Sequence, residues 1–360
     1  MALKISVIAA SELDDGLAGR WQELLALRQD LRSPFYQPGF TRLIAAALPD
    51  ARIAVLESGS RVVGFFPHHR EPWARLSPIG RRLNDYQGLV TEPGLALPAS
   101  ELLRGCNARY MAFDHLPLSQ EQLAGHARLR SASPVMELEG GMTAYRARLG
   151  AASKKGAAGI FQSVGNARRR IERQIGPLRL ALQCHDPAVY ERLVQLKSAQ
   201  FVRTVGARQD PFALPWFNQV LRSVMETDTP GFAGQLSALF AGDRLVACHL
   251  GLRSGPVCHI WFITYDHEFS AYSPGLLLLM AMAEAAPSAG LGLFDLGRGD
   301  QLYKQRFQTG TVPLGQGAVS RPAWLAEAAM AQQARKQWLK TTILGRAWRA
   351  RKTLFQPRPQ

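Results

Sequence analysis

The chain has 360 residues, of which 47% are hydrophobic and 20% are charged, a balance that excludes an intrinsically disordered protein. One hydrophobic core seldom serves so long a chain, so we expect two domains. The formal net charge of +15 favours an anionic partner such as nucleic acid, an acidic membrane surface or a phosphorylated cofactor.

The first 141 residues predict strands and helices that alternate around one mixed sheet. Strands are expected at residues 3–10 and 110–116, helices at 17–28 and 100–109, and a hairpin at 52–70. The two apolar runs of the hairpin meet at Ser58-Gly59-Ser60, a composition that favours a tight turn.

Residues 142–176 have a different character, because eight basic side chains accompany a single acid, Glu172. The basic residues are Arg146, Arg148, Lys154, Lys155, Arg168, Arg169, Arg170 and Arg173. This composition predicts a basic helix or linker that bridges two halves of the protein. A solvated helix face would have the same composition.

Residues 177–320 repeat the order of the first half. The pattern predicts a strand at 178–185, helices at 187–201 and 216–227, three strands within 235–266, an apolar helix at 273–290, a strand at 291–297, a helix at 300–308 and a strand at 311–320. Both halves therefore follow the order strand, helices, hairpin, helix, strand. Such a repeat of plan without repeat of sequence is what a tandem duplication leaves.

Residues 321–360 carry nine basic side chains and one acid, interleaved with tryptophans. This segment predicts an amphipathic helical tail that lies on an anionic membrane, or a helix that packs on the domain through its tryptophans. No segment approaches the ~20 apolar residues that span a bilayer, and the N-terminus lacks the regions of a signal peptide. We expect a cytoplasmic protein, which the first interpretation of the tail would make peripheral at the inner face of the membrane.

A candidate anion site begins the apolar helix. Ser273 suits an N-cap, Pro274 suits the first turn, and Gly275 lets a ligand approach the backbone. A helix start with free N–H groups attracts phosphate. We therefore expect Tyr272, Ser273, Pro274 and Gly275 to bind a phosphorylated cofactor.

Four motifs occur in a fixed order: Tyr265-Asp266, Tyr272-Ser273-Pro274-Gly275, Phe294-Asp295-Leu296-Gly297 with Gly299-Asp300, and Tyr303-Lys304-Gln305-Arg306-Phe307. They resemble the CelD/BcsL-type branch of GNAT acyltransferases, which is associated with cellulose and exopolysaccharide biosynthesis. That branch is related to Fem-type peptidyltransferases, which use aminoacyl-tRNA. The likeness covers residues 165–310, and the usual glycine-rich GNAT signature is absent.

This resemblance implies an α+β (mixed α/β) fold of two tandem GNAT-like domains, each a mostly antiparallel mixed sheet flanked by helices. The expected parts are an N-terminal domain at 1–141, a basic bridge at 142–176, an acyltransferase domain at 177–320 and a basic tail at 321–360. A donor channel is implied in the second domain, with an acceptor cleft between the two.

Acyl transfer needs a nucleophile that loses its proton and stabilisation of an oxyanion. Lys304, between Tyr303 and Phe307, is the candidate that polarises the acyl carbonyl or holds an acceptor anion, and the resemblance places this lysine at the donor end. Asp295, at a strand end, is the candidate general base or orienting group. The structural alternatives are a helix-capping aspartate and a surface lysine. We count Tyr303 with the catalytic residues.

Further substrate contacts are expected from five residues: Asp85, Tyr86, His249, Tyr265 and Arg306. His249 and His259 lie on strands expected to adjoin, where either could serve as a base or fill the core. His68, His69 and His115 have no acidic partner at metal spacing, so no metal site is expected. No nucleophilic serine or cysteine constellation is present, which predicts direct transfer.

These features favour an acyltransferase that transfers an acyl group from acetyl-CoA or another acyl-CoA, as co-substrate, to the amine or hydroxyl of a sugar or cell-envelope polysaccharide precursor. An aminoacyl-tRNA-dependent Fem-like transferase is the alternative, with tRNA as the partner. A second alternative is a non-catalytic scaffold for polysaccharide synthesis at the membrane surface. DNA is not an expected partner.

Overall fold

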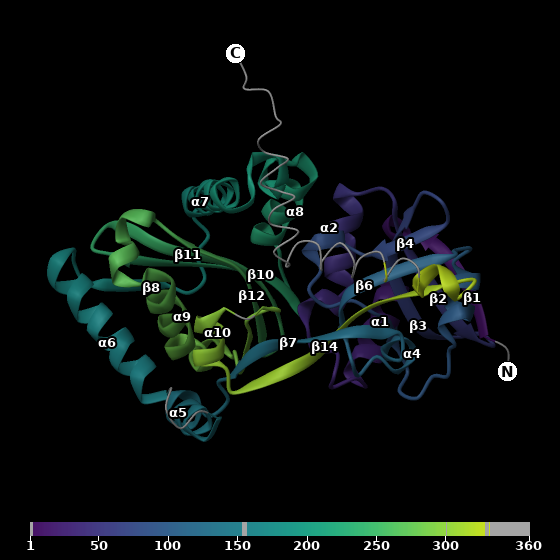
Figure 1. The fold of residues 1–360 in the computed structure, drawn as a ribbon, viewed down its shortest axis with the longest axis horizontal. Coiled ribbons are helices and arrows are strands. Elements are labelled where there is room, and N and C mark those ends of the chain that lie inside the picture. The colour runs from purple at the N-terminus through teal and green to yellow at the C-terminus, as the bar shows by residue number, and fades with distance from the viewer. Residues whose placement is uncertain (1–2, 153–156, 300, 328–330, 332–360) are drawn as a thin grey trace, which may run out of the picture.

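The computed structural model describes residues 3–152, 157–299, 301–327 and 331. In this part of the chain a single 14-stranded sheet passes through the molecule in the order β1-β2-β3-β4-β6-β14-β7-β13-β12-β11-β10-β8, with β5 beside β3 and β9 beside β10. The long sheet and its flanking helices are visible in Figure 1. The expected mixed α/β fold with a mostly antiparallel sheet is confirmed.

The N-terminal half holds the elements up to β7. They are β1 (Leu3–Ala9), α1 (Asp15–Ala26), α2 (Pro38–Ala47), β2 (Ala51–Ser58), β3 (Arg61–Glu71), β4 (Arg75–Pro78), β5 (Val90–Thr91), α3 (Ala99–Gly105), β6 (Tyr110–Pro117), α4 (Glu121–Ala124) and β7 (Ala127–Glu137). The expected hairpin, strands and helices are present. Strand β7 was not predicted, because its polar first half gives no clear alternation.

The C-terminal half holds the remaining elements. They are α5 (Gly141–Ala152), α6 (Ala157–Gln174), β8 (Leu178–Ala181), α7 (Pro187–Val205), α8 (Pro215–Glu226), β9 (Asp228–Thr229), β10 (Phe232–Ala241), β11 (Arg244–Ser254), β12 (Val257–Tyr265), α9 (Pro274–Ala285), β13 (Leu293–Asp295), α10 (Leu302–Phe307) and β14 (Gly310–Ser320). The three strands expected within 235–266 are β10, β11 and β12. Helices α5 and α6 occupy the expected basic bridge.

Helices cover the sheet on both faces. On one face α1, α2, α7 and α8 bury a core that both halves share, in which Trp21 and Phe40 lie with Val220 and Leu221. On the opposite face the core is divided. One cluster lies under α5, α6 and α9, and the other under α3. The shared core and the continuous sheet bind the two halves into one body.

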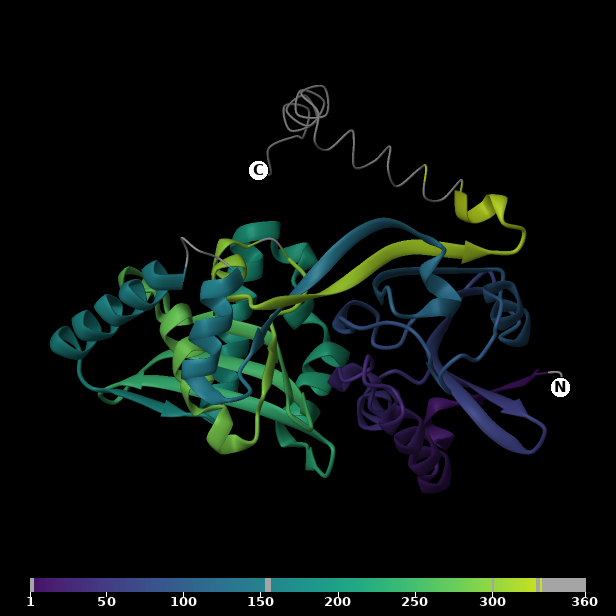
Figure 2. The same ribbon diagram turned by 90° about the horizontal axis from the view of Figure 1, so that it is seen from below.

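Strand β14 crosses from the C-terminal half into the N-terminal half, as Figure 2 shows. It pairs antiparallel with β6 on one side and with β7 on the other. Strand β7 in turn pairs with β13, where Leu293 faces Glu137 and Asp295 faces Val135. Each half therefore completes the sheet of the other. The boundaries expected at residues 141, 176 and 320 stay predictions.

The expected tail at 321–360 lies mostly outside the described residues, which reach only 321–327 and 331 there. Its amphipathic character and its contact with a membrane stay predictions. Within the described ranges, no helix combines the length and the apolar composition that crossing a bilayer requires.

We expect Gly317→Ala to destabilise the protein, because Gly317 lies where β14 is held between both neighbours. A Cβ at this position would lie 2.1 Å from the carbonyl oxygen of His126 and 2.9 Å from Cζ of Phe113. Such overpacking should lower the free energy of unfolding by about 2 kcal/mol, as measured by urea denaturation. Gly19→Ala is the matched control, because nothing lies within 4 Å of its added Cβ. Equal stability of the two variants would contradict the expected clash.

Candidate functional site

Strands β12 and β13 part in the middle of the sheet. Their parallel pairing has three rungs, Val257 with Leu293, Cys258 with Phe294 and His259 with Asp295. Beyond the last rung β13 ends, whereas β12 continues to Tyr265. The neighbouring ladder shifts register between Leu250 and Leu252, which gives β12 one extra residue, and such bulges often adjoin active sites. The sheet is therefore open on one side of β12 beyond His259.

A cavity of about 550 Å³ lies at this opening. Its walls come from β12, the turn after β13, the start of α9, α10 and α7, and Asp85 reaches it from the N-terminal half. The polar and charged residues that line it include Asp85, Lys197, Gln200, Ser273, Arg298 and Lys304. The cavity thus belongs mainly to the C-terminal half, and Asp85 is its lining residue from the N-terminal half. The acceptor cleft between the halves stays a prediction.

Asp295 is a buried carboxylate beside this cavity, with 4% of its surface exposed. It accepts hydrogen bonds from the hydroxyl of Tyr86, from the hydroxyl of Ser133 at 2.5 Å and from the amide of Gly297 at 2.9 Å. Burial alone would raise its pKa, but the adjacent His259 and these donors lower the pKa below its usual value. Asp295 is therefore ionised, but it is buried and both of its oxygens are engaged by protein donors, so it fits the orienting role better than the role of base.

His259 lies between two carboxylates. Its Nε2 is 3.0 Å from Oδ2 of Asp85, and its Nδ1 forms an ion pair with Oδ1 of Asp295 at 3.6 Å. Burial of the ring lowers its pKa, yet the two carboxylates outweigh burial and raise the pKa to about 9. The ring is therefore an imidazolium at neutral pH that joins a carboxylate of each half.

Asp85 is the member of this group that faces the cavity, and its side chain is 22% exposed. His115 lies on its other side, with Nε2 3.7 Å from Oδ1 of Asp85. A Cβ on Gly297 would lie 3.5 Å from Oδ2 of Asp85, and φ of Gly297 is +71°, a conformation that favours glycine. Asp85 is therefore the carboxylate that a substrate can reach.

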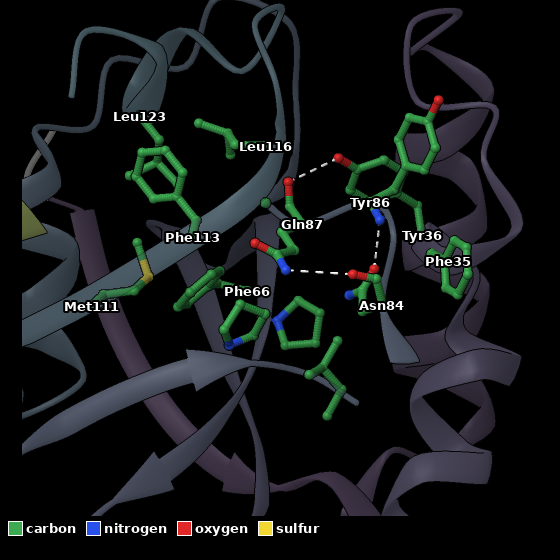
Figure 3. Close-up of a pocket in the computed structure, with 14 residues that line it drawn as sticks. Phe35, Tyr36, Phe66, Asn84, Tyr86, Gln87, Met111, Phe113, Leu116 and Leu123 are labelled. Atoms are coloured by element: carbon green, nitrogen blue, oxygen red, sulfur yellow. Dashed lines mark hydrogen bonds between the residues drawn. The ribbon is translucent and has the colours of Figure 1, made fainter. Parts of the chain in front are cut away.

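The segment that carries Asp85 is held firmly, as Figure 3 shows. The side-chain oxygen of Asn84 accepts a hydrogen bond from the backbone amide of Tyr86 at 2.7 Å. The hydroxyl of Tyr36 donates a hydrogen bond to the backbone carbonyl of Gln87 at 3.1 Å. The apolar hollow beside these residues encloses about 10 Å³. This is room for about one water, so the hollow is too small for a substrate, and the hydrogen bonds position the segment.

Lys304 is buried at the cavity wall, 6% exposed. Its ammonium donates to the carbonyl oxygens of Gly297 at 2.9 Å and Arg298 at 3.1 Å. It therefore holds the turn that follows Asp295. Tyr303 lines the same wall.

Lys197 is a second cavity lysine, and sequence reasoning missed it. The pKa of Lys197 is lowered to about 8, mainly by burial, with a raising contribution from Cys248 and a smaller lowering contribution from Lys304. The helical period could have indicated it. Lys197 follows Tyr190 by seven residues and Leu193 by four, so it lies on the same face of the helix as these buried side chains.

At the start of α9, Ser273 and Gly275 line the cavity, whereas Pro274 is buried and Tyr272 lies outside the lining. Ser273 occupies the N-cap position as expected, but its side chain makes no capping bond. Its backbone is left-handed, with φ 53° and ψ 50°. The ring of Tyr272 instead lies under the guanidinium of Arg170 at 4.8 Å.

Of the remaining expected contacts, Tyr265 lines the cavity and Tyr86 holds Asp295 from behind. His249 and Arg306 are not among the lining residues. His249 is fully buried on β11, where burial lowers its pKa to about 3. Arg306 is exposed on α10, two residues beyond Lys304 and so on another face of the helix. Ser133 was missed because β7 was missed.

A metal site was not expected from the sequence. Across the ranges that the structure describes, no three His, Cys, Asp or Glu side chains gather in a way that could hold a metal ion.

Comparison with known proteins is consistent with this geometry. Residues 160–305 match the model of the acetyltransferase (GNAT) domain. No curated protein is similar in sequence. The C-terminal domain of a putative lysylphosphatidylglycerol synthetase from Agrobacterium fabrum has a TM-score of 0.52 and 16% identity, over 87% of this chain and 94% of that chain. At this identity the likeness shows a shared fold.

Two further solved structures are less similar. FemX has a TM-score of 0.49 and 11% identity, over 74% of this chain and 87% of that chain. A tandem GNAT protein from the clavulanic acid biosynthesis pathway has a TM-score of 0.45 and 15% identity, over 88% of this chain and 97% of that chain. The domain match and the fold support an acyltransferase enzyme of the GNAT type. The finer likeness to the CelD/BcsL branch stays a prediction.

We expect Asp295→Asn to lower the pKa of His259. Only Asp85 would then raise this pKa, whereas burial of the ring would still lower it. The raised pKa of His259 stabilises the fold fully below pH 6.5, and this contribution is lost as the pH rises towards about 9. Below pH 6.5 the variant should therefore lose about 3 kcal/mol of unfolding free energy, and this loss should shrink between pH 6.5 and 9. NMR titration of the ring and urea denaturation measure the two effects. Asp114→Asn is the control, and an unchanged His259 pKa in Asp295→Asn would refute the assignment.

Proposed function

We propose that the protein is an acyltransferase that transfers an acyl group directly from acyl-CoA to an amine or hydroxyl of a saccharide acceptor, such as a cell-envelope polysaccharide precursor. One observation carries this proposal. The parting of β12 and β13 opens a cavity onto which Asp85 of the other half faces. The saccharide class is supported by the sequence motifs that resemble exopolysaccharide enzymes.

The donor would enter from the start of α9. Ser273 and Gly275 lie there at the cavity wall, and the positive dipole end of a helix start attracts a pyrophosphate. Helix α6 runs beside this entrance, where Arg170 donates to the carbonyl of Ala271 at 3.0 Å. Arg169 and Arg173 on the same helix are exposed and add positive charge.

The acceptor would approach Asp85. Its nitrogen or oxygen attacks the thioester carbon and forms the new C–N or C–O bond, while the proton that it loses passes to the carboxylate of Asp85. The C–S bond breaks, and the thiolate takes up a proton and leaves as the CoA thiol. The imidazolium of His259 holds Asp85 in place at 3.0 Å. Lys304 fixes the turn that borders the reacting group.

We expect Asp85→Asn to lower kcat about 10²- to 10⁴-fold, the usual effect of losing a general base. Acyl-CoA binding, followed by calorimetry, should change little, because Asp85 lies on the acceptor side. Asp228→Asn is a matched control at an exposed ion pair with Arg253. Full activity of Asp85→Asn would contradict the assignment of Asp85 as the base. Full activity of Lys304→Ala would contradict the role proposed for Lys304.

An aminoacyl-tRNA donor is a second candidate, and the basic surface of α6 favours it. Arg170 lies beside the donor entrance, and Arg169 and Arg173 are exposed on the same helix, where they could neutralise tRNA phosphates.

We expect filter binding to show weak, steeply salt-dependent tRNA retention, and calorimetry to show saturable binding of acetyl-CoA. Saturable binding of aminoacyl-tRNA with no heat from acetyl-CoA would reverse the order of the two candidates. Duplex DNA of equal charge is the control for non-specific attraction. Equal retention of DNA and tRNA would show that the α6 surface attracts nucleic acids only through non-specific charge.

A further inference from the structure

The basic side chains that line the cavity differ in the groups that they contact. Arg298 contacts Asp114, with Nη1 2.5 Å from its carbonyl oxygen and Nη2 3.8 Å from its Oδ2. Lys304 donates to two carbonyl oxygens. Lys197 donates to the neutral amide oxygen of Gln200 at 3.2 Å. Within the described part of the chain, no carboxylate forms an ion pair with Lys197.

This arrangement is electrostatically incomplete. Lys197 is half-buried at the cavity wall, and partial withdrawal of an ammonium from water has a cost that a nearby opposite charge offsets. Lys197 and Lys304 both line this cavity. An anionic group bound beside Lys197 would offset the cost of its partial burial.

The position of Lys197 assigns this anion to the acceptor. Helix α7 packs on the sheet face that carries the core shared by both halves. Helix α9, whose start is the donor entrance, packs on the opposite face. Asp85 reaches the same cavity from the N-terminal half. A molecule held by Lys197 therefore lies on the side away from the donor phosphates.

We propose that Lys197 binds an anionic group of the acceptor, a phosphate or a carboxylate, while Asp85 faces the amine or hydroxyl that is acylated. The inference rests on the proposed function and names its substrate class: an acidic amino sugar or sugar phosphate. The anion sets the acceptor's orientation, so Lys197 is a specificity-determining residue.

Calorimetry of the full-length protein tests this with three acceptors that share one core: glucosamine, glucosamine 6-phosphate and muramic acid. The phosphate and carboxylate arms distinguish the two kinds of anion. We expect at least one acidic sugar to bind at least 10-fold more tightly than glucosamine. Lys197→Gln should abolish that preference and leave glucosamine binding unchanged. Lys197→Arg should keep the preference, and Lys4→Gln, an exposed lysine on β1, is the matched control.

Equal binding of all three sugars by the wild-type protein, or an equal loss for glucosamine in Lys197→Gln, would overturn the inference. If no sugar binds, inorganic phosphate is titrated at constant ionic strength. Phosphate binding that Lys197→Gln weakens supports the site, and phosphate binding that is absent or unchanged in the variant overturns it. Acetyl-CoA binding is measured separately, and its absence would count against the proposed function alone.

If Lys197→Gln does not fold, a competition experiment on the wild-type protein tests the inference instead. Inorganic phosphate should then displace glucosamine 6-phosphate and leave glucosamine bound. Failure to compete would overturn the inference.

Discussion

The buried imidazolium of His259 is the interaction on which the site depends. It lies on the last rung of the β12–β13 ladder, opposite Asp295, and it reaches Asp85 of the other half at 3.0 Å. A single buried carboxylate or imidazole would be costly in this environment, but the three together compensate one another. This charge group lies where the pairing of the two strands ends, and it includes Asp85, which lines the cavity.

That charge group can exist only because the two halves share one sheet. Tyr86 and Ser133, which hold Asp295, belong to the N-terminal half, and Ser133 lies on β7. Strand β7 reaches Asp295 because it pairs with β13, and β14 holds β7 from its other side. The crossing of β14 is thus part of the site as well as of the fold. A half without its partner would leave Asp295 with fewer donors.

The cavity separates its charges by side. The positive start of α9 and the arginines of α6 lie towards one face of the sheet, where a phosphorylated donor would be attracted. Asp85 lies at the junction of the halves, and Lys197 approaches from α7 on the face opposite α9. In the proposed reaction, this division would bring an anionic donor and an anionic acceptor to the cavity from opposite sides, with the carboxylate of Asp85 between them.

Much of this protein could be predicted from its sequence, because local signals determine strands, turns and helix starts. The apolar runs joined by glycine-containing turns predicted β10, β11 and β12, and Ser273-Pro274 predicted the start of α9. The sequence also pointed to Asp85, Asp295 and Lys304, since polar residues stood out beside buried strands. Only the tertiary structure decided that Asp295 meets His259 and that Lys197 faces the cavity. The first contact depends on the parallel pairing of β12 with β13, and the second depends on how α7 packs on the sheet. Ser133, which donates to Asp295, comes from β7, more than 150 positions away. Local sequence patterns determine each element, but they do not record which distant elements pair or pack.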